Sequence, residues 1–119
     1  MSISTNYLPK SKVETIPEVK EYLNNLVTIL YEKKYFGFED FAIDYVDELL
    51  NDILTTLPLR PSKPAPKRFN RYGEDMEYAS FRKNRQTTWY VFFETYEDNE
   101  EITYLVRYIS NNHVIAKHL

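Results

Sequence analysis

Basic side chains and two histidines are the groups in this sequence that could act on an anionic ligand. Eight Lys or Arg residues but only three Asp or Glu lie between Arg60 and Arg85, although the whole chain has a formal net charge of −3. Such a patch can bind an anion even in an acidic protein. His113 and His118 lie near the C-terminus, and histidine is a common residue in proton transfer. We therefore expect an anion-binding site, with His113 as the candidate for proton transfer.

Each basic group also has a second interpretation. Arg82 and Arg107 can lie beside Tyr90 and bind phosphates and stacked bases. They can equally be exposed arginines that pair with Glu94, because surface ion pairs are common. A basic loop cluster can hold phosphate or simply keep the loop solvated, and its members are Lys67, Arg68 and Arg71.

The composition excludes several kinds of site. The chain has no cysteine, so it cannot form a disulfide, a thiolate metal site or a cysteine nucleophile. Its two glycines, Gly37 and Gly73, stand alone and cannot build a phosphate-binding glycine loop. Two histidines without further ligands are too few to hold a metal. We therefore expect neither a metal nor a cofactor.

Size and hydropathy predict one domain in the cytoplasm. A chain of 119 residues with 43% hydrophobic residues can bury a single core. The first ten residues lack the pattern of a signal peptide, and the apolar runs are too short to span a bilayer. We expect a cytoplasmic location and no contact with a membrane.

A central β-strand is predicted at Thr87–Tyr96, which is rich in aromatic and β-branched residues. Side chains alternate across a strand, so one row contains Trp89, Val91 and Phe93 and suits a cover of helices. Flanking strands are expected at 77–83 and 101–109. Together the three strands predict an antiparallel meander over 77–110.

The elements before the meander follow from apolar spacing and from proline. An edge strand is expected at 2–8, and two capping boxes, Ser11 with Glu14 and Thr15 with Glu18, predict a helix start near Thr15. Apolar residues then recur at helical spacing in two stretches, which predicts an antiparallel helical hairpin over about 15–57 with its second helix at Phe38–Leu57. The remaining segments are a basic, proline-rich connector at 58–76 and a polar tail at 111–119.

The second face of the sheet is expected to form the floor of an open groove. The chain has seven Phe and eleven Tyr, more than the helix-facing rows need, and exposed aromatic clusters usually mark a binding surface. Arg82 and Arg107 are expected to flank the groove. Its predicted floor carries Tyr78, Tyr90, Phe92 and Glu94.

The predicted order of a short strand, a helical hairpin, three strands and a tail resembles the RelE/ParE superfamily of bacterial toxins. Local pieces match as well: L-P-L-R-P before a basic loop, the strand pair Y-A-S-F-R-K-N and T-T-W-Y-V-F-F, and Y-L-V-R-Y-I-S followed by N-N-H-V-I-A-K-H-L. The resemblance implies one α+β domain over 1–119, in which the helical hairpin covers one face of an antiparallel sheet.

The resemblance also implies a toxin of a type II toxin–antitoxin module, neutralised by a cognate antitoxin protein. RelE-like toxins cut messenger RNA on the ribosome without a metal, whereas ParE-like toxins inhibit DNA gyrase. For RNA cleavage, charge would come from Lys67, Arg68, Arg82 and Arg107, and proton transfer from His113, Lys117 or His118.

This sequence departs from the ribonuclease pattern in its C-terminal segment. Asn111, Asn112 and His113 stand where RelE-like enzymes are rich in arginine, and no tyrosine follows Tyr108. A non-catalytic module of the same fold that binds a protein partner is therefore the alternative to the enzyme.

Overall fold

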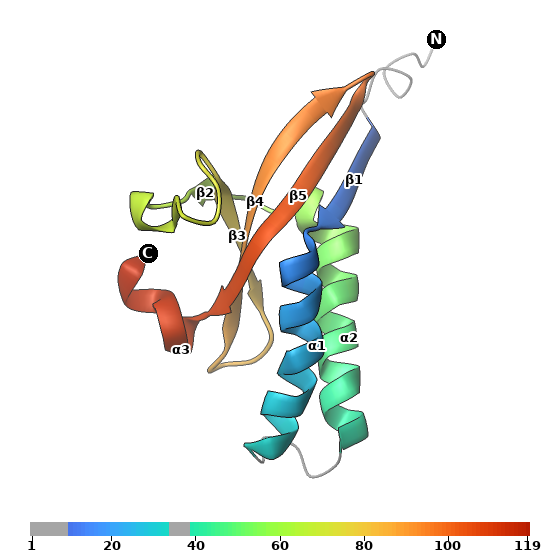
Figure 1. Ribbon diagram of the computed structural model, residues 1–119, viewed down its shortest axis with the longest axis vertical. Coiled ribbons are helices and arrows are strands. Elements are labelled where there is room, and N and C mark those ends of the chain that lie inside the picture. Colours follow the sequence, from blue (N-terminus) through green and yellow to red (C-terminus); the bar gives the residue numbers. More distant parts are fainter. Residues whose placement is uncertain (1–9, 34–38) are drawn as a thin grey trace.

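The computed structural model describes residues 10–33 and 39–119 and has the predicted α+β class. One five-stranded sheet has the strand order β1-β5-β4-β3-β2, with two long helices on one side of it (Figure 1). The strands are β1 (Lys10–Thr15), β2 (Lys63–Pro64), β3 (Glu77–Arg82), β4 (Thr88–Asp98) and β5 (Glu101–Asn111). The helices are α1 (Pro17–Glu32), α2 (Glu39–Thr56) and α3 (Asn112–Ile115), with 3-10 turns η2 (Leu57–Leu59), η3 (Lys67–Phe69) and η4 (Ala116–His118).

The helical hairpin is confirmed, but its start is not formed by the predicted capping boxes. Ser11 and Glu14 lie in β1, and α1 begins at Pro17, whose fixed φ and missing amide suit the first helical position. Ile16 precedes it in an extended conformation, without a side-chain cap. Helices α1 and α2 then run antiparallel. Among the described residues, neither is long and apolar enough to cross a membrane.

The first strand corrects the prediction of a purely antiparallel sheet. The edge strand predicted at 2–8 lies outside the described residues, and β1 is found at Lys10–Thr15 instead. It pairs in parallel with β5, from Lys10 opposite Glu101 to Thr15 opposite Val106. The pairing is parallel because the helical hairpin and the meander reverse the chain so that β5 runs in the direction of β1 (Figure 1). The sheet is therefore mixed.

The meander is confirmed, whereas the connector and the tail are more ordered than expected. Strand β4 pairs antiparallel with both β3 and β5. Within the connector, Lys63 and Pro64 form β2, a two-residue edge strand beside β3. The tail folds into α3 and η4, and Asn111 caps α3 through its side-chain oxygen. Both segments lie on the side of the sheet opposite α1 and α2 (Figure 1).

A β-bulge in β5 changes which side chains share a face. Phe92 pairs with Tyr108 and Phe93 with Val106, so Arg107 is the extra residue. An inserted residue reverses the alternation beyond it. Val106 therefore faces the helices while Tyr108 faces the other side, although residues two positions apart in a regular strand share one face.

The first core lies between the helical hairpin and the sheet. It contains the predicted row of Trp89, Val91 and Phe93, each at most 3% exposed, so that assignment is confirmed. Helix α2 contributes Leu49 and Ile53, which are fully buried. The first core as a whole consists of Val19, Leu23, Leu26, Val46, Leu49, Ile53, Leu57, Ala79, Phe81, Trp89, Val91, Phe93, Val106 and Ile109.

Candidate functional site

The second face of the sheet is covered, which corrects the expectation of an open groove. Phe92 has no exposed surface, and it stacks on Phe69 of η3 at a centroid distance of 4.6 Å. Met76 and Ile115 bury the same ring from the connector and from α3. We call these four residues the second core. Phe92 therefore supports this core and cannot touch a partner while the cover is in place.

Tyrosines surround the second core and remain partly accessible. Tyr72 stacks on Tyr108 at 3.8 Å with the rings 7° from parallel. Tyr78 and Tyr90 meet edge to face at 6.0 Å, and both line a hollow of about 530 Å³ at the start of the connector. The structure thus brings these two predicted binding residues together. It adds two cations that the prediction missed, Arg60 and Lys63.

The three candidate catalytic residues do not converge. Arg82 pairs with Thr88 of β4, whereas Arg107 lies beside Phe92 and Phe93. Four residues along a strand span about 13 Å and two strand spacings about 10 Å, so the two backbones lie about 16 Å apart. Arg82 donates through Nε to the Asn84 carbonyl at 3.2 Å. One phosphate cannot be held by both guanidinium groups in this arrangement.

Arg107 is tied into the fold and has the ion-pair role that was the alternative interpretation. Its Nη1 lies 3.2 Å from Glu94 Oε1, and its Nε donates to the Tyr72 carbonyl at 2.6 Å. A Cβ placed on Gly73 would lie only 2.8 Å from Arg107 Cδ and Nε. The glycine therefore lets the connector approach the arginine closely, and Arg107 joins the connector to β4 and β5.

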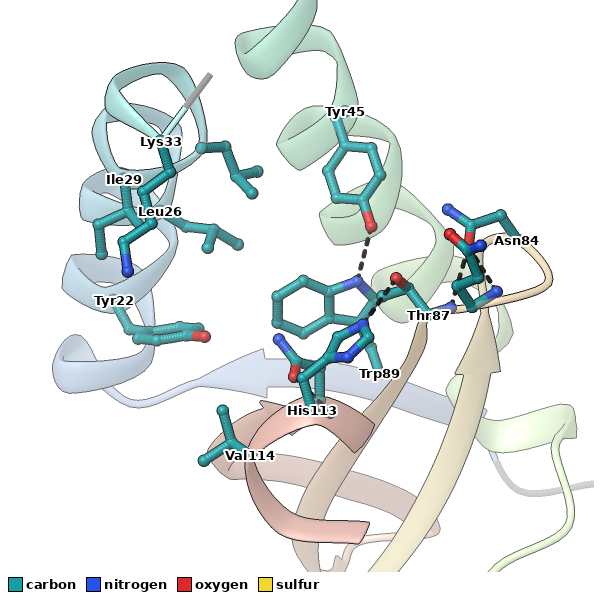
Figure 2. A pocket seen from close by; sticks show the side chains of 13 residues that line it. Tyr22, Leu26, Ile29, Lys33, Tyr45, Asn84, Thr87, Trp89, His113 and Val114 are labelled. Atoms are coloured by element: carbon teal, nitrogen blue, oxygen red, sulfur yellow. Dashed lines mark hydrogen bonds between the residues drawn. The ribbon is translucent and has the colours of Figure 1, made fainter. Parts of the chain in front are cut away.

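His113 faces away from both arginines. It lies at the start of α3, where its Nε2 is 3.2 Å from Thr87 Oγ1. The ring points into a cleft between α3, the β3–β4 turn and the helical hairpin (Figure 2). Because Arg82 projects from the opposite face of the sheet to its neighbour Phe81, a proton carried by His113 would not reach a phosphate beside Arg82.

The predicted basic loop and the basic tail come together although they are about fifty positions apart. A hydrogen bond joins Arg68 Nη1 to His118 Nδ1. Partial burial, and then the charges of Arg68 and Lys117, lower the pKa of His118 below its ordinary value of 6.5. The neutral imidazole can accept from the guanidinium. Lys67 and Lys117 are exposed beside them, and these four residues form what we call the basic cluster.

Arg71 lies apart from the basic cluster. Its guanidinium carbon is 5.0 Å from the centroid of the Tyr72 ring, within the range of a cation–π contact. Both residues line a hollow of about 360 Å³ beside Arg107 and the start of α1. Arg71 therefore serves a different surface from Lys67 and Arg68.

One cleft of the described structure was not predicted from the sequence. It lies between the helical hairpin and α3 and has a volume of about 790 Å³. Its lining includes Lys33, Tyr45 and Trp89, as well as His113 (Figure 2). The apolar stripe on α1 was visible in the sequence, but the approach of the β3–β4 turn and α3 to that stripe depends on tertiary packing. Within the described ranges, no group of three or more His, Asp or Glu could hold a metal ion.

Comparison of the chain with protein-family models, with curated proteins and with solved structures finds no match.

Proposed function

We propose that this chain is a toxin of a type II toxin–antitoxin module, similar to RelE/ParE toxins, that acts by binding its target and not by cleaving RNA. A cognate antitoxin protein would neutralise it. The order of β1, two antiparallel helices and the β3–β5 meander is in keeping with the layout that the resemblance implies. The helical hairpin on one face of the sheet is in keeping with it too.

The observation that carries the binding mechanism is the separation of Arg82, Arg107 and His113. Cleavage through the RNA 2′-hydroxyl needs a base, an acid and cations around one phosphate. Here Arg107 is bound to Glu94 and Tyr72, and His113 faces a different cleft. The same cations on a wide surface are compatible with binding an anionic or acidic target.

Inducible expression in a bacterial host tests the proposal. We expect growth arrest that is relieved by co-expression of the product of an adjacent small reading frame. Messenger RNA on ribosomes should stay intact during the arrest. Growth at high expression without any neighbouring binder would overturn the toxin assignment.

A double variant separates binding from catalysis. Specific cleavage of ribosome-bound messenger RNA by the intact protein, lost in Arg82→Ala with Arg107→Ala, would establish a ribonuclease and overturn the binding mechanism. Circular dichroism must show that the double variant is folded, because Arg107 is tied to Glu94. Arg85→Ala, which changes an exposed cation in the β3–β4 turn, is the matched control. DNA damage signalling with intact RNA would identify gyrase as the target.

A further inference from the structure

The cleft between the helical hairpin and α3 has the size of a small-molecule site. Its volume of about 790 Å³ falls in the range of about 300–1,000 Å³ that is typical of ligand pockets. It is bounded by α1, by Tyr45 of α2, by the β3–β4 turn and by the start of α3 (Figure 2). Neither the basic cluster nor Arg107 contributes to it.

The floor of the cleft is a rigid aromatic surface. Trp89, the only tryptophan, is 2% exposed, and its indole Nε1 donates to the Tyr45 hydroxyl at 2.9 Å. Burial raises the pKa of Tyr45 above its ordinary value of 10.0, so the hydroxyl keeps its proton at neutral pH. An apolar ligand would therefore meet a surface whose orientation is already fixed.

One wall of the cleft is a stripe along α1. Tyr22, Leu26, Ile29 and Lys33 recur at four, three and four positions, which places them on one side of the helix. The stripe extends about 16 Å at 1.5 Å per residue. Ile29 is 41% exposed and Val114, across the cleft on α3, is 61% exposed. The mouth of the cleft thus presents apolar side chains to solvent.

The opposite end of the cleft presents hydrogen-bond donors. Asn84 Oδ1 accepts from the Gln86 and Thr87 amides at 2.9 Å, and Asn111 Oδ1 accepts from the His113 amide at 2.9 Å. With their oxygens occupied, both asparagines offer an NH2 group, and neither group bonds to another described residue. This end of the cleft suits an acceptor.

The charge of the cleft also favours an anion. None of the described residues that line it is Asp or Glu, although the chain has a net charge of −3. Lys33 makes no ion pair within the described ranges and stands at the end of the apolar stripe. Helix α2, by contrast, contains six acidic residues and no Lys or Arg. A cation would be drawn to the exposed side of α2, and an anion to the cleft.

From these features we propose that the cleft binds a small amphiphilic carboxylate. Its apolar chain or ring would lie along the α1 stripe, over Trp89, and its carboxylate would accept from Lys33. This site is independent of the proposed toxin function, because it shares no residue with the basic cluster or with the Arg107 contacts.

Three probes with the same apolar chain and different head groups test the proposal: decanoate, decanol and decyltrimethylammonium. Each is titrated into the full chain below its micelle concentration, and Trp89 fluorescence reports occupation of the cleft. We expect decanoate to bind about threefold to tenfold more tightly than decanol, as one charge-assisted contact would give, and the cation to bind weakest.

Two substitutions at Ile29 introduce opposite charges at the mouth of the cleft, and both remove the apolar isoleucine side chain. Ile29→Glu should weaken decanoate binding about tenfold, whereas Ile29→Lys should preserve or strengthen it. Lys33→Ala should weaken decanoate binding about threefold to tenfold and leave decanol unchanged. Lys20→Ala, an exposed lysine of α1 that does not line the cleft, is the control.

Several outcomes would overturn the proposal. Equal affinity for the three probes, or no saturable change in Trp89 fluorescence, would show that the cleft does not select a carboxylate. So would matching effects of Ile29→Glu and Ile29→Lys. Self-association in sedimentation experiments that is lost in both Ile29→Glu and Ile29→Lys would instead assign the cleft to a second copy of the chain. An acidic helical peptide that binds while decanoate does not would assign it to a protein partner.

Discussion

The two faces of the sheet are buried by different means. The first core is covered by α1 and α2, two long helices whose apolar residues recur at regular spacing. The second core is covered by η3 and α3, short turns that come from either side of the meander in the sequence. A regular helix face is rigid because many contacts and backbone hydrogen bonds hold it. A cover of short turns depends on a few anchors, and here Arg107 and the contact between Arg68 and His118 supply them.

Matched phenylalanine truncations test this contrast most strongly. Phe81 in the first core and Phe92 in the second are both fully buried. Phe81→Ala should lower the free energy of unfolding by about 4 kcal/mol and Phe92→Ala by about 3 kcal/mol, because a thin cover can collapse into the space that is left. Urea denaturation measures both values.

Leu59→Ala serves as the control for these truncations. Leu59 is 82% exposed, so its truncation should change the free energy of unfolding little. A larger loss for Phe92→Ala than for Phe81→Ala would mean that the second core is the less adaptable of the two.

The ion pair between Arg107 and Glu94, which helps to hold the cover of the second core, should give the next largest effect on stability. Its side chains are 32% and 25% exposed. Arg107→Ala leaves Glu94 and the Tyr72 carbonyl without this partner. It should lower the free energy of unfolding by about 1–3 kcal/mol. In a double-mutant cycle with Glu94→Gln, a coupling energy near zero would contradict the idea that this pair anchors the cover.

Gly73→Ala examines the same anchor from the connector side. The new Cβ would be 2.8 Å from Arg107 and 3.0 Å from Met76 Sδ, so the cover must shift. We expect a loss of about 1–2 kcal/mol in the free energy of unfolding. The same substitution in an Arg107→Ala background should cost clearly less. Equal costs in both backgrounds would mean that the strain arises elsewhere.

The smallest expected effect is a pH dependence of stability that arises in the cover of the second core. The pKa of His118 is lower in the folded protein than its ordinary value of 6.5, so the fold favours the neutral imidazole. Its contribution to stability is complete above pH 6.5 and is lost as the pH falls below that value. Denaturation on both sides of pH 6.5 should show this loss in the intact protein and not in His118→Gln. His113→Gln should keep the dependence, and its loss in that variant would contradict the assignment to His118.

The same contrast explains how much of the fold could be predicted. Apolar spacing was sufficient for α1, α2 and the row of Trp89, because those residues bury themselves against one regular partner. Spacing did not predict which face each residue of β5 occupies beyond Arg107. The bulge there leaves no local pattern in the sequence, yet it moves Tyr108 to the other face. Residues of the predicted capping boxes form strand β1 and not a helix start, because β1 gains hydrogen bonds to β5 that an isolated helix start cannot offer.

The candidate sites followed the same rule. Tyr78 with Tyr90, and Arg68 with His118, were named from the sequence and do meet in space. The open floor at Phe92 was wrong because a polar tail carries one well-placed apolar residue, Ile115. The cleft at Trp89 could not be predicted, since its polar end consists of asparagines whose oxygens are used by nearby backbone amides.

The parallel pairing of β1 with β5 has a consequence for how the chain folds. Lys10 lies opposite Glu101, 91 positions later in the sequence. Contacts of such long sequence separation must form against the entropy of closing a large loop, and they slow folding. The edge of the sheet can therefore be completed only after every other strand has been made. During synthesis, β1 must therefore wait for β5 to leave the ribosome before it gains its pairing partner.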